Sequence, residues 1–116
     1  MIEFDQGSLG RTQQLLDALA LRAKVAMHNI ANQNTPGFKR YEVSFEAELG
    51  QALASGGDGQ DVRPTVTRDE SGQPGVNNVS AVDEQATLEK VRMLNDIFTR
   101  RAGSYFQRMN RAIFGR

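Results

Sequence analysis

Two long apolar repeats, one near each end of the 116-residue chain, limit what this sequence can fold into more than any other feature. In both repeats the residues are spaced alternately three and four apart, which places them on one face of an α-helix. The first repeat predicts a helix over 8–33 and the second a helix over 81–114. Their members are Leu9, Thr12, Leu16, Leu19, Ala23, Ala26 and Ile30, then Leu88, Val91, Asn95, Phe98, Ala102, Tyr105, Met109 and Ala112.

The ends of the second helix carry local signals. Ser80, followed three residues later by Asp83, matches an N-terminal capping box, and Gly115 is typical of the residue just beyond a helix. Asn95 lies on the apolar repeat, where a buried amide would fix the register between two helices. For the first helix, either Ser8 or Asp5 is a suitable cap.

A turn motif stops the first helix. Pro36 lacks a backbone donor and disfavours helical geometry at Thr35, while Gly37 accepts the positive φ that a type II turn requires. The motif predicts a sharp, rigid exit from the helix. Its residues are Asn32, Asn34, Thr35, Pro36, Gly37, Phe38 and Lys39.

The middle of the chain, 34–80, has weaker patterns. Phe45, Leu49 and Leu53, preceded by Ser44, predict a short helix over 44–54. A glycine-rich polar loop follows at 55–59, and the segment 63–68 suggests a short edge strand that begins near Pro64. The whole chain is expected to form one domain, mainly α, with this irregular middle between the two long helices.

Charge is unevenly distributed, although the formal net charge is zero. From Glu42 to Glu89 there are ten acids and two bases, whereas from Arg92 to Arg116 there are six arginines and one acid. Complementary regions of this kind suit a head-to-tail assembly, and they suit equally two solvated faces of a monomer. The arginines that we expect at a subunit interface are Arg100, Arg101, Arg108 and Arg111.

Catalytic and cofactor sites are not indicated. The chain has no cysteine and one histidine, His28, whose neighbours are poor metal or acid–base partners. The loop 56–59 lacks the lysine of a phosphate-binding loop, and Asp58 and Asp61 lack the ligand pattern of a calcium loop. We therefore expect no catalytic, cofactor or metal residues, no small-molecule substrate and no enzyme activity.

The basic end of the chain raises the alternative of a small nucleic-acid-binding module. Its arginines lie beside Tyr105 and Phe106, which supplies cations and stacking rings. The aromatic residues nevertheless follow the helical repeat, which favours a packing role. The first residues contain acids and no continuous apolar run, so we expect neither a cleaved secretion signal nor a direct lipid anchor.

Two paired helices bury one stripe each, and a chain of this size has little material for a thick core. Flanking apolar residues such as Leu15, Leu21, Ile97 and Phe106 would then stay partly exposed. Contacts with other chains would cover them. A compact two-helix hairpin, with the middle folded over it, is the alternative.

The turn and its flanks resemble a family signature. Asn29–Lys39, followed by Phe45–Leu49 and the ending Ala112–Arg116, is similar to the bacterial flagellar rod and hook family of axial proteins, most closely to its short proximal-rod members. Before its last helix this family has an Asp-Gly-Asn-x-Val-Asp entry. This chain has Gly75-Val76-Asn77-Asn78-Val79-Ser80 instead, which keeps the glycine and asparagine but neither acid.

The resemblance implies a fold and a role. The terminal helices would pair as an antiparallel coiled coil in a helically assembled tube, joined within a subunit by the repeat residues and between subunits by the arginines. The tube would transmit motor torque and form the export channel. The chain would be exported by the flagellar type III system to the periplasmic rod, with copies of itself, other rod proteins, the export gate and membrane-ring components as partners. Another short rod protein of the family remains an alternative.

Overall fold

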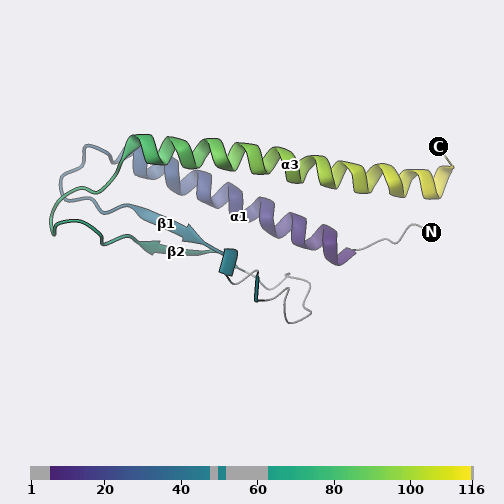
Figure 1. Cartoon of the computed structure of the whole chain (residues 1–116), viewed down its shortest axis with the longest axis horizontal. Helices are drawn as coiled ribbons and strands as arrows, with labels where there is room; N and C mark the ends of the chain where they lie inside the picture. Colours follow the sequence, from purple (N-terminus) through teal and green to yellow (C-terminus); the bar gives the residue numbers. More distant parts are fainter. Residues whose placement is uncertain (1–5, 48–49, 52–62, 116) are drawn as a thin grey trace.

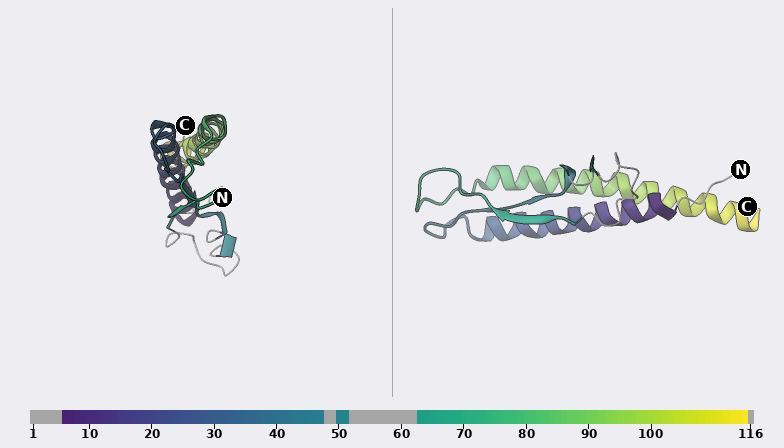
Figure 2. Two further views of the ribbon diagram at one scale, coloured as in Figure 1. Left: turned by 90° about the vertical axis from the view of Figure 1, so that its left-hand side faces the viewer. Right: turned by 90° about the horizontal axis from the view of Figure 1, so that it is seen from below.

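The computed structural model describes residues 6–47, 50–51 and 63–115. It has two long helices, α1 (Gln6–Ala31) and α3 (Ala81–Phe114), and two short strands, β1 (Tyr41–Ser44) and β2 (Thr65–Arg68). The helices run antiparallel side by side, and the strands lie along one side of the helix pair (Figures 1 and 2). The chain is therefore mainly α with a small sheet, in a molecule that measures 61 × 30 × 13 Å.

The helix ends follow from local chemistry. α1 covers Gln6–Ala31, against a predicted 8–33, and α3 has the predicted bounds. The Ser80 cap is confirmed, because its hydroxyl oxygen accepts a hydrogen bond from the Asp83 backbone N–H at 3.3 Å. Gly115 is confirmed as the C-terminal stop, with φ of 67° and its N–H bonded to the Arg111 carbonyl.

The two strands form an antiparallel pair in which Tyr41 lies opposite Arg68 and Ser44 opposite Thr65. β2 falls within the predicted 63–68 strand. β1 was not expected, and Ser44 proves to be the last residue of β1 rather than the first of a helix. Helical backbone is described at 46–47 and 50–51, while Leu49 and Leu53 of the predicted short helix lie outside the described residues.

The core lies where β1 meets the helix pair. Leu19 of α1, Val91 of α3, and Val43 and Phe45 from β1 and its end are all buried and form one apolar cluster with Ala18. β1 thus supplies a third wall that two helices alone would lack, and this favours the alternative in which part of the middle folds over the helix pair. Such burial is the main stabilising contribution to the described fold.

The far part of α3 differs from this core. α3 continues past the first residues of α1, so its last turns have no α1 beside them (Figures 1 and 2). Ile113 and Phe114 are 61% and 66% exposed, and Phe106 is half exposed. Apolar side chains at helical spacing are therefore left in water at this end of the molecule.

Candidate functional site

The site that the structure builds most carefully is the interhelical joint, where the end of α1, the two turns and the start of α3 meet. We define it by five polar residues, Asn29, Arg40, Asn77, Asn78 and Glu84. They come from four separate stretches of the chain, and each makes a hydrogen bond to a residue far away in the sequence. The joint includes the predicted turn motif but is larger than it.

Two proline–glycine turns lie against each other at the joint. In the first, the Phe38 N–H donates to the Thr35 carbonyl at 3.2 Å and Gly37 has φ of 73°, as a type II turn requires. The second has the same features: a bond between Val76 and Gln73, and Gly75 at φ of 74°. A Cβ built on Gly37 would lie 3.5 Å from the Gly75 carbonyl oxygen, so the turns are close neighbours.

Asn77 holds the turn that follows α1. Its side-chain amide donates to the carbonyl oxygens of Asn32 at 2.9 Å, Gln33 at 3.2 Å and Thr35 at 2.7 Å. Asn77 lies 44 positions further along the chain than Gln33, just before α3. The segment before α3 is therefore tied to the turn after α1.

Asn78 joins the chain segments that lie on either side of the two strands. Its Oδ1 accepts from the Arg40 backbone N–H at 2.7 Å, and its Nδ2 donates to the Asp69 carbonyl at 2.7 Å. The Asn78 N–H also bonds to the Phe38 carbonyl at 3.3 Å. The two adjacent asparagines thus hold both chain segments that lead into and out of the sheet.

Asn29 and Glu84 form the buried centre of the joint. Asn29 is fully buried, and its amide both donates to the Tyr41 carbonyl at 2.8 Å and accepts from the Tyr41 N–H at 2.9 Å, as a neighbouring strand would. Its Nδ2 is also 3.2 Å from Oε1 of Glu84, which is 1% exposed. Nε of Arg40 donates to the same carboxylate oxygen at 2.6 Å. These bonds satisfy polar groups whose burial would otherwise be unfavourable.

Charge pairing sets the protonation of the joint. Burial opposes the charged form of Arg40, but hydrogen bonds to Glu84 and Asp69 outweigh it and raise the pKa of Arg40 above its ordinary value. Hydrogen bonds from the Ser71 side chain and backbone, and then from Arg40, lower the pKa of Asp69 to about 2. Both groups are therefore charged across the physiological pH range.

Lys39, the last residue of the turn motif, is 7% exposed. Its ammonium donates to the carbonyl oxygens of Ser71 at 3.0 Å and Gln73 at 2.8 Å, so it ties the turn motif to the second turn. Beside it, the rings of Phe38 and Tyr41 lie 6.1 Å apart. The Arg68 guanidinium is 4.5 Å from the Tyr41 ring centre, which joins β2 to this cluster.

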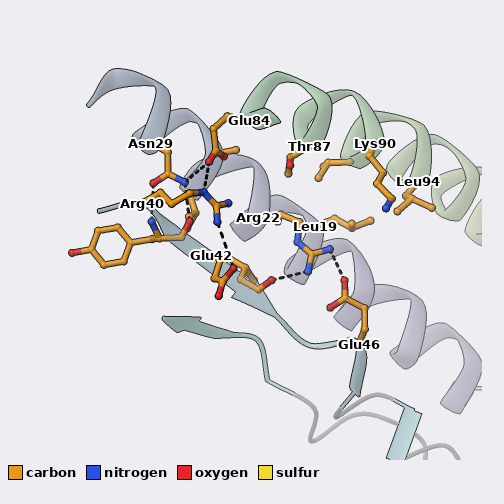
Figure 3. A pocket seen from close by; sticks show the side chains of 15 residues that line it. Leu19, Arg22, Asn29, Arg40, Glu42, Glu46, Glu84, Thr87, Lys90 and Leu94 are labelled. Carbon is orange, nitrogen blue, oxygen red and sulfur yellow. Dashed lines mark hydrogen bonds and ion pairs between the residues drawn. The ribbon is translucent and has the colours of Figure 1, made fainter. Parts of the chain in front are cut away.

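A groove of about 320 Å³ lies between α1, β1 and the first turns of α3, and Leu19 and Val91 are among the residues that line it. Figure 3 shows its labelled polar side chains. Except for Lys90, its charged groups are paired within the described part of the chain. Arg22 lies 2.6 Å from Glu46 and also donates to the Val43 carbonyl at 2.7 Å. The Arg22 hydrogen bond lowers the pKa of Glu46 to about 2. These groups hold β1 on α1 and form no arrangement of nucleophile and base.

The predicted helix-repeat residues do not share one environment. Leu19, Ala26 and Val91 are buried, and Asn95, predicted to fix the helix register, is exposed. The buried polar contact between the helices is Asn29 with Glu84 instead. Leu16, Ala23, Ile30, Leu88 and Phe98 are partly buried, and the side chains of Ala102, Tyr105 and Met109 lie outside the described residues.

The predicted interface arginines lie on the exposed part of α3. Arg100 is paired with Asp96 one helical turn earlier at 3.1 Å, and Arg108 and Arg111 are exposed. The side chain of Arg101 lies outside the described residues. Within the described ranges, no group of three or more histidine or acidic side chains gathers as a metal site, and no helix is long and apolar enough to cross a membrane.

The fold and the joint define a class, that of an elongated, mainly α chain whose two long helices are held together at one end. Comparison with known proteins narrows the class. The chain is 50% identical over 46 residues to the flagellar basal body rod protein FlgB of Borrelia hermsii, a match covering 40% of this chain and 34% of that protein. It is 45% identical over 53 residues to FlgB of Borreliella burgdorferi, covering 46% and 38%.

These matches confirm the resemblance to the flagellar axial proteins and support membership of the FlgB family. The chain spans little more than a third of the length of the curated relatives it matches. No model of a known protein family matches it.

Proposed function

We propose that this chain is a structural subunit of the flagellar basal body rod, in the proximal segment. The similarity to two FlgB rod proteins carries the proposal. The interhelical joint supports it, because a rod subunit must keep its helices at a fixed angle under load. In this role the chain is not an enzyme.

The two long helices are the parts that would build the tube. They pair as an antiparallel coiled coil, with Leu19, Ala26 and Val91 in the seam, and this pairing extends from the joint toward the termini. Contacts between unlike surfaces of successive copies, repeated by rotation and rise, generate an open helical tube. The tube carries torque along its wall and leaves a central channel for exported proteins.

The joint gives each subunit its stiffness. Asn77 bonds to the turn after α1 and Asn78 bonds to Arg40. Glu84 of α3 bonds to Asn29 of α1 and to Arg40, so a twist applied to α1 is passed directly to α3. The two proline–glycine turns have few alternative backbone states. The turn motif thus acts as a rigid corner.

Partners and location follow from the role. The subunit reaches the periplasmic part of the basal body through the flagellar type III system. Copies of itself and other rod proteins contact its helices, and the export gate and membrane-ring components contact the base of the rod. The exposed arginines and apolar residues of the far part of α3 supply contact surface for these partners.

The test is genetic and structural. A strain of the source bacterium that lacks this chain is expected to be non-motile and to make basal bodies without a rod, and the full-length gene is expected to restore both. A chain carrying a small tag should appear in isolated basal bodies at the ring-proximal end of the rod. Normal swimming of the deletion strain would refute the proposal.

A further inference from the structure

Two stripes on the helices are exposed in the described fold, apart from the partly buried Leu16 at the end of one of them. The α1 outer stripe consists of Leu16, Ala20, Lys24, Met27 and Ala31, and the α3 outer stripe consists of Val82, Ala86, Glu89, Met93 and Ile97. Resting on the proposed rod role, we propose that the α1 outer stripe of one copy packs against the α3 outer stripe of the next. The partner is thus a second copy of this chain, held by a specified register.

Exposure is the first argument. Met27 is 55% exposed, Val82 76%, Met93 57% and Ile97 53%, although each lies on a well-formed helix. The strands lie along one side of the helix pair (Figure 2), and the exposed fractions show that they do not cover these four side chains. On α3 the stripe lies opposite the face that carries Glu84 and Val91, so this helix has apolar residues on two sides.

Spacing is the second argument. Along α1 the stripe residues are separated by four, four, three and four positions, and read backwards along α3 the separations are the same. Antiparallel stripes with equal spacing can meet along their full length. The resulting pairs are Leu16 with Ile97, Ala20 with Met93, Lys24 with Glu89, Met27 with Ala86, and Ala31 with Val82.

Size and charge complementarity are the third argument. Ala20 would face the larger Met93, and Met27 would face the smaller Ala86, so each large side chain would pack into the space beside a small one. Each stripe contains one charged residue, and these are the oppositely charged Lys24 and Glu89, which face each other. Neither has a hydrogen bond or ion pair within the part of the chain that the structure describes.

The register agrees with the one inside the subunit. Within the chain Asn29 meets Glu84, and the proposed pairs continue that same alignment of α1 with α3. Each copy would therefore lie beside the next at nearly the same level. Since the contact joins two different surfaces, a row of copies keeps a free α1 outer stripe at one end and a free α3 outer stripe at the other, so the assembly is open and polar.

Paired cysteines test the contact, because the natural chain has none. Chains with Ala20→Cys and chains with Met93→Cys should form disulfide-linked dimers when mixed and oxidised in assembled rods, and neither should do so alone. The double variant should give a ladder of linked oligomers. Ala20→Cys with Ala86→Cys is the out-of-register control and should remain at least about tenfold less linked, since disulfides need Cβ atoms within roughly 4.5 Å.

A charge exchange is a second test of the proposed contact. Lys24→Glu and Glu89→Lys are each expected to reduce assembly several-fold, and the double variant is expected to restore it. Linked dimers of Ala20→Cys alone, or no rescue by the double variant, would overturn the proposed contact. If the cysteine variants restore motility but form no disulfide, the contact is rejected and the rod role stands. If the disulfide forms but the deletion strain swims normally, the contact is supported and the rod role is rejected.

Discussion

The two ends of α3 lie in different surroundings, one buried and the other exposed. Near the joint, Glu84 and Val91 are buried, and Glu84 is hydrogen-bonded to residues from distant parts of the chain. Toward the other end, Ile113 and Phe114 are mostly exposed. One continuous helix therefore belongs half to a folded unit and half to a surface, and the difference suggests which half depends on other chains for its order.

Hydrogen exchange of the dilute monomer tests this contrast most directly, with the largest expected effect. Amides near Leu19 and Val91 should exchange about 10³-fold or more slowly than in an unfolded chain, because they open only with the core. Amides over 99–114 should be slowed by roughly tenfold or less, and should gain protection on assembly. Equal protection along the whole of α3 would remove the distinction between its two halves.

Core truncation comes next. Leu19→Ala removes a fully buried side chain and should lower the free energy of unfolding by about 2–5 kcal/mol, measured by urea titration. Ile113→Ala, on the exposed end, should change it by less than about 0.5 kcal/mol. A similar loss in both variants would mean that the exposed end contributes to monomer stability as much as the core does.

Breaking the centre of the joint should lower the free energy of unfolding slightly less than the core truncation does. Glu84→Ala leaves the buried Asn29 amide without an acceptor and takes from Arg40 its closest partner, and we expect a loss of roughly 2–4 kcal/mol. The matched control is Asp96→Ala, which breaks the exposed pair with Arg100 and should cost about 0–0.5 kcal/mol. The unfolding temperatures of the two variants, measured side by side, test whether the joint contributes more stability than the exposed pair.

Glycine substitutions should have opposite signs in the two regions. Gly37→Val forces a β-branched residue to a φ of 73° and should destabilise the chain by about 1–2 kcal/mol. We expect it to disturb rod assembly more than export, as counted in isolated basal bodies. Gly103→Ala, in the exposed half of α3 with open space around it, should stabilise by about 0.5–1 kcal/mol. Normal rods from the Gly37 variant would show that the corner need not be rigid.

The smallest effect is a pH dependence at Glu46. Its folded pKa of about 2 lies below the ordinary 4.5, so the Arg22 pair stabilises the fold above pH 4.5, and this contribution is lost as the pH falls toward 2. The Glu46 side chain is 60% exposed, which limits the contribution to about 0.5 kcal/mol. Glu46→Gln should therefore be less stable than the natural chain at pH 7 and equal to it near pH 2. Glu70→Gln, in an exposed loop, is the control.

Local sequence signals predicted the helices and turns well. The type II turn at Gly37, the Ser80 cap and the Gly115 stop each depend on a few neighbouring residues, and the structure contains all three. The relation to flagellar axial proteins was also visible in the sequence, because the turn motif is distinctive. Such features do not depend on residues that are far away in the sequence.

The joint could not be read in the same way. Asn29, Asn77 and Glu84 look like ordinary surface residues, and their hydrogen bonds reach partners from 12 to 55 positions away that only the fold brings together. β1 is four residues long and pairs with a strand beyond a long connection, so periodicity gives no signal for it. The signal that was present is the Asn77-Asn78 pair just before a helix cap, since adjacent asparagines often bond to the backbone of turns.

The two acceptors of Lys39 are backbone carbonyl oxygens, and the Asn77 and Asn78 contacts are bonds from neutral amides. Dissolved salt screens interactions between exposed charges, with a Debye length of about 10 Å at 0.1 M, and has little effect on buried neutral bonds. A rise in ionic strength would thus weaken the proposed arginine contacts at the far end of α3 while the neutral bonds of the joint persist. Salt would then separate the proposed assembly into copies that each keep their shape.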